Sequence, residues 1–256
     1  MKLRLRNLAM ITAAVSVAAC GDTPTPTATT VPEALQAQRG ADQAERRTYE
    51  VTVTNDIAEG QWLTPPLVVL HQRAEDVFTV GKKASFEVKE IAENGNLGPM
   101  LELLGASRHV SDFAVLPPPP PPTPLMGGQT VSVELTAEPG ARFVSFISML
   151  ICTNDGFTGL DGVHLPPRVG QSVVLTADAY DAGTEMNTED FTDLVPPCQV
   201  ITNGSVAEPG SGMSNPALME GGVIHHHDGI LGGADLDPAF HGWDDPVVTI
   251  EIVRTS

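Results

Sequence analysis

Acidic side chains are the residues of this chain best suited to chemistry, and they gather between positions 154 and 193. Carboxylates that loops bring together repel one another unless a cation neutralises them. Calcium, which takes about six to eight oxygen ligands in tolerant geometry, is the natural cation for such a site. The spacing does not match an EF-hand, so a merely solvated acidic surface stays open as a second interpretation. The candidate donors are Asp155, Asp161, Asp181 and Glu185, with Asn187, Glu189, Asp190 and Asp193 behind them.

A run of three histidines is the other feature with ligand chemistry. In an extended chain His225 and His227 face the same side. Together with a third ligand such as His241 or His71, they would suit copper or zinc. A copper- or zinc-binding envelope protein is therefore the alternative to a calcium protein. A purely structural role for the run also stays open.

Two cysteines, Cys152 and Cys198, remain once Cys20 is set aside as the predicted lipidation site described below. Exported proteins with two cysteines in one domain most often join them, and the close C-x-x-C spacing of zinc sites is missing. We therefore predict a Cys152–Cys198 disulfide. In the chain-entropy model, closing a loop of about 47 residues contributes about 4 kcal/mol to stability.

The first 19 residues have the features of a signal peptide: a basic start, an apolar run from Leu8 to Ala19 and small residues at its end. That run is too short to span a membrane. The sequence Val17-Ala18-Ala19-Cys20 resembles a bacterial lipobox, in which cleavage precedes a cysteine that then carries lipid. We expect a lipid-anchored envelope protein. Gly21 in place of aspartate after Cys20 favours the outer membrane, facing either the periplasm or the cell surface.

Composition sets the remaining limits. The chain has 256 residues and a net charge of −18, from 14 Lys+Arg against 32 Asp+Glu, which excludes electrostatic binding of nucleic acid. No nucleophile-elbow, zinc-protease, Walker or dinucleotide motif occurs, so we expect no enzyme. The expected partners are the membrane, through the lipid, and a protein or glycan surface.

Hydrophobic periodicity predicts a mainly β domain over residues 48–256, after a signal peptide (1–19) and a lipidated, disordered tether (20–47). Six prolines, Pro117 to Pro122, predict an exposed polyproline loop. The segment between Gly81 and Asn94 predicts a short helix closed by Gly95, and Leu97 to Leu104 is helical or irregular. The predicted strands are 49–54, 67–71, 130–136, 142–151, 172–177 and 247–253. Of these, 130–136 and 142–151 should form a central hairpin, and the last strand should pair near the first.

Several segments, in order, resemble the spondin N-terminal domain of F-spondin and mindin. The family pattern has a "vSmi" strand, then P-D-W-F-x-G-x-D, then D-A-G-T-D, after an upstream H…G…AS…AExG segment. The matching residues, which span about Tyr49 to Arg254, are His71, Gly81, Ala84-Ser85, Ala92-Glu93-Asn94-Gly95, Ser145 to Leu150, Asp155 to Asp161 and Asp181 to Glu185. The resemblance implies a C2-like antiparallel β-sandwich with one or two short helices. It also implies calcium in the end loops and a role in adhesion.

Carried over position by position, the resemblance makes Asp155, Asp181 and Glu185 the calcium ligands, with Asp161 as a weaker candidate. Four features depart from the family pattern: Asn154 replaces proline, Gly156 replaces tryptophan, Glu185 replaces aspartate, and no glycine follows Glu185. The longer arm of Glu185 keeps the charge but moves the oxygen, which puts the affinity in question. The thrombospondin-type repeats of the animal proteins do not occur in the sequence, so their partners cannot be inherited.

Overall fold

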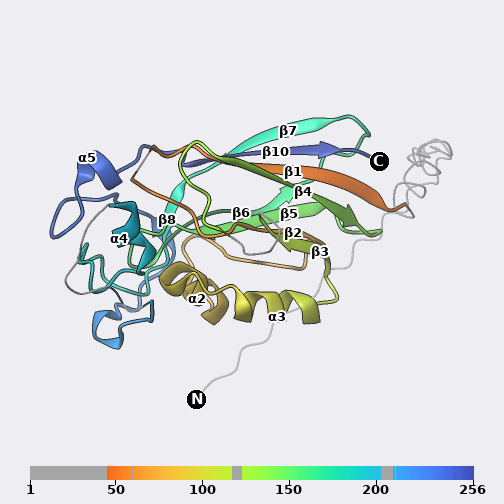
Figure 1. The fold of residues 1–256 in the computed structure, drawn as a ribbon. Coiled ribbons are helices and arrows are strands. Elements are labelled where there is room, and N and C mark those ends of the chain that lie inside the picture. The colour runs from red at the N-terminus through yellow and green to blue at the C-terminus, as the bar shows by residue number, and fades with distance from the viewer. Residues whose placement is uncertain (1–44, 59, 117–122, 203–209, 211) are drawn as a thin grey trace, which may run out of the picture. The chain divides into compact units, whose positions relative to one another are not determined.

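The computed structural model describes residues 45–58, 60–116, 123–202, 210 and 212–256. The predicted signal peptide, Cys20, most of the tether and the six prolines lie outside these ranges. The described chain is mainly β, as predicted, and forms two antiparallel sheets of four and six strands with short helices. Figure 1 shows the sheets as two stacked layers. Within the described ranges, no helix combines the length and the hydropathy that a membrane crossing requires.

The four-stranded sheet has the order β4-β1-β10-β7. Its strands are β1 (Arg47–Asn55), β4 (Thr130–Ala137), β7 (Ser172–Ala177) and β10 (Val248–Arg254). Buried and more exposed residues alternate along β1 and β10, because one face packs on the core and the other meets solvent. The predicted pairing of the last strand with the first is confirmed, with Val51 opposite Ile252.

The six-stranded sheet has the order β3-β2-β5-β6-β8-β9. Its strands are β2 (Leu67–His71), β3 (Val110–Val115), β5 (Phe143–Met149), β6 (Gly156–His164), β8 (Ala179–Asp181) and β9 (His225–His226). Every residue of β2 is buried, because both faces of this sheet are covered. The sequence predicted β2 and all of β5, whose predicted range 142–151 overruns the strand at both ends, but not β3, β6, β8 or β9.

The predicted hairpin between 130–136 and 142–151 is wrong. β4 pairs with β1, whereas β5 pairs with β2 and β6 in the other sheet. The turn near Gly140 therefore carries the chain from one layer to the other. The burial patterns give the reason: β4 alternates and belongs to a half-exposed sheet, while β5 is buried along nearly its whole length.

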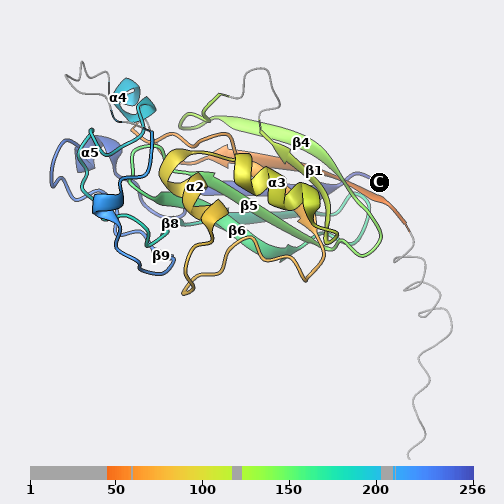
Figure 2. The same cartoon turned by 90° about the horizontal axis from the view of Figure 1, so that it is seen from below.

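Two helices cover the outer face of the six-stranded sheet, as Figure 2 shows. The predicted helix is α2 (Phe86–Asn94); the Ser85 hydroxyl caps its start by accepting from the Val88 N–H. Gly95 ends it at φ 62°, a left-handed conformation that glycine adopts without strain. The second is α3 (Gly98–Ala106). Shorter helical turns are α4 (Pro197–Ile201), η1 (Pro216–Leu218) and α5 (Pro238–His241).

The fold has two hydrophobic cores. One fills the space between the sheets and includes Tyr49, Phe146 and Ile250. The other lies between the six-stranded sheet, the helices and the loops that follow β8, and it includes Ile91 and Phe157. Because β5 alternates between the two, it links both cores.

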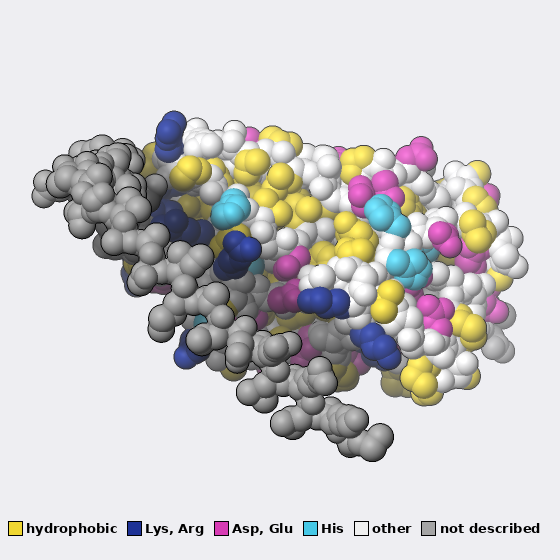
Figure 3. All heavy atoms as spheres, turned by 180° about the vertical axis from the view of Figure 1, so that it is seen from behind, with side chains coloured by type: hydrophobic (Ala, Val, Ile, Leu, Met, Phe, Trp, Pro, Cys, Tyr) yellow, Lys and Arg dark blue, Asp and Glu magenta, His cyan; other side chains and the backbone are white. Residues whose placement is uncertain are grey.

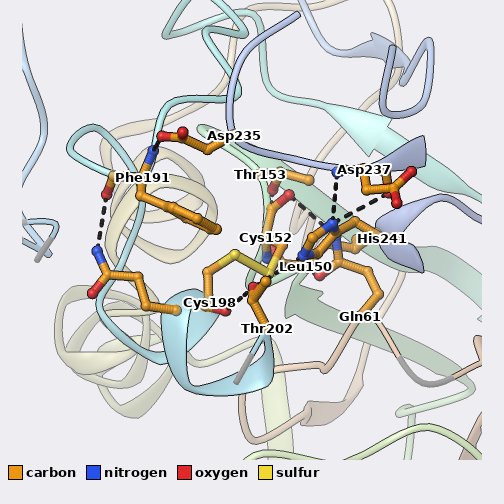
Figure 4. Close-up of a disulfide and its surroundings, with 11 residues drawn as sticks. Gln61, Leu150, Cys152, Thr153, Phe191, Cys198, Thr202, Asp235, Asp237 and His241 are labelled. Atoms are coloured by element: carbon orange, nitrogen blue, oxygen red, sulfur yellow. Dashed lines mark hydrogen bonds between the residues drawn. A yellow bond between two sulfur atoms is a disulfide. The ribbon is translucent and has the colours of Figure 1, made fainter. Parts of the chain in front are cut away.

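The predicted disulfide is present and joins Cys152, just after β5, to Cys198 in α4 (Figure 4). Both cysteines are fully buried. The Gln61 side chain holds the Cys152 backbone at both its N–H and its carbonyl. The bond therefore fixes the loops after β8 to the end of the central strand.

Removing this disulfide is expected to destabilise the domain by about 4 kcal/mol, because the cysteines are 46 positions apart and the unfolded chain regains the loop entropy. Urea unfolding of the double variant Cys152→Ala/Cys198→Ala measures the loss. The same protein with added reductant is the control, since reductant should then have no further effect. A loss below about 1 kcal/mol would contradict the entropic account.

Candidate functional site

Asp155 organises the loops at one end of the sandwich. It is fully buried in the tight turn between β5 and β6. One carboxylate oxygen, Oδ2, accepts from the backbone N–H of Thr184 (2.7 Å), the Thr184 hydroxyl (3.0 Å) and the backbone N–H of Glu185 (3.0 Å). The other oxygen, Oδ1, is buried and has no hydrogen-bond partner. Such an orphaned anionic oxygen is costly unless a proton or a bound cation neutralises it.

Asp181 ends β8 directly beside Asp155, because it pairs with Gly156 at the start of β6. It is 3% exposed. Its Oδ1 accepts from the Gly183 N–H and its Oδ2 from the Asn187 side-chain amide, both at 2.7 Å. Each oxygen keeps a lone pair, so both remain available to a cation.

Glu185 stands on the far side of the same loop and is also 3% exposed. Its Oε1 accepts from the Asn215 backbone N–H. Behind it lies Glu93 of α2, a buried acid that pairs with Lys89 and leaves its own Oε1 without a partner. Sequence reasoning missed Glu93 as a member of this cluster. The available signal was an acid placed next to the buried Ile91 and Ala92 of the helix.

Burial and mutual repulsion shift the acidity of this cluster. Burial, followed by the charge of Asp181, raises the pKa of Asp155 to about 6. Burial is also the main reason why the pKa of Glu185 rises to about 7, and the charges of Glu93 and Asp155 add to it. The ionised forms of both groups are therefore disfavoured in the protein alone.

These residues fit a calcium ion by chemistry. All donors are carboxylate oxygens, and one of them is buried and unpaired. A divalent cation would offset the repulsion that, after burial, adds to the rise in the pKa values of Asp155 and Glu185. In the described chain the acids do not gather as tightly as three ligand atoms within 4.8 Å of one another. An ion held by Asp155, Asp181 and Glu185 must therefore draw their side chains together.

Asp161, the weaker candidate, belongs to another part of the molecule. It lies six positions along the strand from Asp155, a span of about 20 Å, so the two cannot share an ion. Its Oδ1 accepts from the Ser145 hydroxyl (2.8 Å) and the Val77 N–H (3.0 Å). Ser145 in turn lies 2.7 Å from Nε2 of His71. Three residues of the family pattern thus form one polar network across β2, β5 and β6.

The histidine run lies on the strand next to Asp181. His225 is opposite Asp181 in the β8–β9 pair, and its Nδ1 is 3.8 Å from the carboxylate. His227 is 7% exposed and packs edge-on against Trp243. Its Nδ1 accepts from the Gly229 N–H, so its proton sits on Nε2, which is buried and unpartnered. A protonated Nε2 is a donor rather than a metal ligand.

The two residues predicted as a third ligand, His241 and His71, lie elsewhere. His241 sits beside the disulfide; its Nδ1 accepts from the Asp237 N–H, and its Nε2 contacts the Thr202 hydroxyl at 3.0 Å (Figure 4). Cys152, Cys198 and His241 are the only described group of three with ligand atoms within 4.8 Å, and the disulfide occupies both sulfurs. Both nitrogens of His71 are also engaged. The structure does not bring a third histidine to the His225–His227 pair.

Comparison with known proteins gives one result that bears on this site. The family model described as Spondin_N matches residues 55–211, which include the turn at Asp155 and the loop from Asp181 to Glu185. No curated protein matches the chain. The matched range stops before the histidine run and β10.

The raised pKa values predict how stability depends on pH in a chelator. When a carboxyl has a higher pKa in the folded than in the unfolded state, the free energy of unfolding falls as pH rises from the unfolded pKa through the folded one. The free energy of unfolding should therefore fall from about pH 4, near the unfolded values, through about 6 for Asp155 and about 7 for Glu185. Urea titrations across this range measure it.

Asp155→Asn should flatten this dependence, because the amide does not ionise. The matched control is Glu251→Gln, an exposed acid on β10, which should leave the slope as it is. The interpretation is wrong if both variants change the slope equally, or if wild-type stability rises throughout this range.

Proposed function

Because the chain belongs to the Spondin_N family, we propose that it is an exported lipoprotein whose spondin domain binds calcium and serves in adhesion or in contacts within the cell envelope. The lipid anchor is Cys20, in the lipobox-like sequence that ends the leader. The calcium ligands are Asp155, Asp181 and Glu185. The partner is a protein or glycan of an adjoining surface.

The observation that carries the calcium proposal is the buried, unpartnered Oδ1 of Asp155. Its sister oxygen already binds three donors from the loop at Thr184, so the carboxylate cannot turn away. It must keep one bare oxygen beside Asp181. A bound cation supplies the missing partner and offsets the repulsion between the two acids.

Calcium would also join separate parts of the fold. Asp155 lies before β6 and Asp181 ends β8, while Glu185 contacts the segment at Asn215. Drawing the three carboxylates onto one ion would fix the loops at this end of the sandwich as a single surface. A surface of that kind, rigid only with calcium bound, suits reversible contacts with a partner.

A transition-metal protein is the second candidate function. The free Nε2 of the exposed His225 and its place opposite Asp181 favour it. The hydrogen bond from Gly229 to Nδ1 of His227 and the distant position of His241 weigh against it. We therefore propose calcium first.

Calcium in the millimolar range should raise the thermal midpoint of the chain from Gly21 to Ser256 above its value in chelator, because the ion binds only the folded state. Asp181→Ala should abolish that rise. Glu251→Ala is the matched control, since it removes an exposed acid of β10, in the other sheet, that is not among the proposed ligands. Differential scanning calorimetry gives the midpoints.

Micromolar copper and zinc form the comparison in the same experiment. A rise with copper or zinc alone, lost in His225→Ala, would replace the calcium proposal with the transition-metal one. Absence of any metal response would leave the acids as a solvated surface and refute both.

The lipid anchor has its own test. In a bacterial host, the wild-type chain should fractionate with membranes and incorporate labelled palmitate, whereas Cys20→Ala should do neither, because the thiol is the acylation site. A Cys20→Ala protein that stays in the membrane fraction without label would contradict the lipoprotein proposal.

A further inference from the structure

All seven arginines of the described chain lie at one end of the sandwich. The strand pairing places them there. The start of β1, the end of β10 and the start of β7 are neighbours in one sheet, and the end of β2 and the starts of β3 and β5 are neighbours in the other. The residues are Arg46, Arg47, Arg73, Arg108, Arg142, Arg168 and Arg254.

The acidic loops occupy the opposite end, where β1, β5 and β7 finish and β6 begins. On the face shown in Figure 3, Lys and Arg side chains lie on the left and in the centre, and acids become frequent toward the right. The arginine end is not free of acids. Arg46 pairs with Glu138 at 2.6 Å, and Arg254 lies 3.7 Å from Glu45.

One cavity at the arginine end is lined by two arginines, a histidine and apolar residues. Its volume is about 270 Å³, and its walls are Arg47, Arg142, His164, Leu165 and Pro167. No carboxylate lines it. A guanidinium pair with an imidazole provides several N–H donors and at least two positive charges, which is the chemistry that recognises a phosphate oxyanion.

The strands place the two arginines on the walls of this cavity. Arg47 is the first residue of β1 and shares its inward-facing side with Tyr49 and Val51, so its side chain enters the gap between the sheets. Arg142 directly precedes β5; its carbonyl accepts from the Leu165 N–H at 2.9 Å. The Arg142 guanidinium makes no hydrogen bond or ion pair with another residue of the described chain.

The position of the cavity relative to the predicted lipid anchor indicates which phosphate-bearing molecule it would meet. Arg47 follows Cys20 by 27 positions, so the cavity lies at the end of the domain that the chain enters from the proposed lipid anchor. Membrane leaflets that contain anionic lipids present phosphate groups and a negative potential, which attract arginines near the surface. The acidic end would be repelled and would face away.

We propose that the cavity between Arg47, Arg142 and His164 binds the phosphate of an anionic lipid headgroup and so seats the domain on its membrane with the acidic loops outward. The anion site stands on the cavity alone, whereas the lipid source of the phosphate rests on the proposed lipid anchor. The calcium site takes no part.

The test uses the chain from Gly21 to Ser256 without lipid and in chelator, so that neither acylation nor calcium contributes. Sedimentation with vesicles of phosphatidylcholine, with and without phosphatidylglycerol, measures binding to the headgroup. Thermal midpoints in millimolar inorganic phosphate measure binding of the free anion. Arg142→Gln removes a wall of the cavity; Arg168→Gln removes an equal charge at the same end but not from the cavity.

Binding is expected only with phosphatidylglycerol, and Arg142→Gln should weaken it about fivefold more than Arg168→Gln does. Inorganic phosphate should raise the midpoint of the wild type and of Arg168→Gln but not of Arg142→Gln. Equal losses in the two variants would overturn the cavity as the site. A phosphate response without vesicle binding would overturn the lipid as its source and leave a site for a free anion. Failure of the Cys20 acylation test would likewise remove the lipid source, while the phosphate response still judges the cavity.

Discussion

The buried carboxylate of Asp155 is the constraint on which the functional end of this domain depends. It sits where the chain reverses from β5 into β6, and its hydrogen bonds fix the backbone at Thr184 and Glu185 about thirty positions later. Without them, β8 and β9 would have only short ladders to hold them against the sheet. The disulfide acts from the other side by tying α4 to the end of β5. The hydrogen bonds of Asp155 and the Cys152–Cys198 disulfide thus hold the loops after β8 from two sides.

Much of the fold could be predicted from the sequence because its strongest signals are local. Alternation marked β1 and β4, and helical spacing of apolar residues with a closing glycine marked α2. β6 escaped prediction because glycines interrupt it. A Cβ at Gly159 would lie 2.6 Å from the Phe146 carbonyl oxygen, so the glycine there reflects close approach of a neighbouring strand, which has no trace in local sequence. The false hairpin has a similar origin, since no local signal shows that a turn passes between layers.

The candidate site likewise combines features that local sequence predicts with features that only tertiary packing sets. Residue types and motif order predicted that Asp155, Asp181 and Glu185 belong together, and the loops do bring them to one end of the sandwich. Motif order could not separate Asp161 from them, because six positions along an extended strand move a residue by about 20 Å without changing the pattern. Nor could it find Glu93, which reaches the cluster from a helix by tertiary packing. Whether His227 can bind a metal depends on which ring nitrogen carries its proton. The Gly229 N–H, a single backbone donor, fixes that position, and the sequence does not show it.

The pairing of β1 with β10 has a consequence for how such a chain is made. These two strands form the centre of the four-stranded sheet, yet they come from opposite ends of the domain, with Tyr49 opposite Arg254. Until β10 has been synthesised, β1 and β7 lack the strand that joins them, and the core beneath the four-stranded sheet is incomplete. Closing this sheet brings together residues about 200 positions apart in the chain. Contacts of such high sequence separation form slowly, so completion of the four-stranded sheet should be a late step in folding.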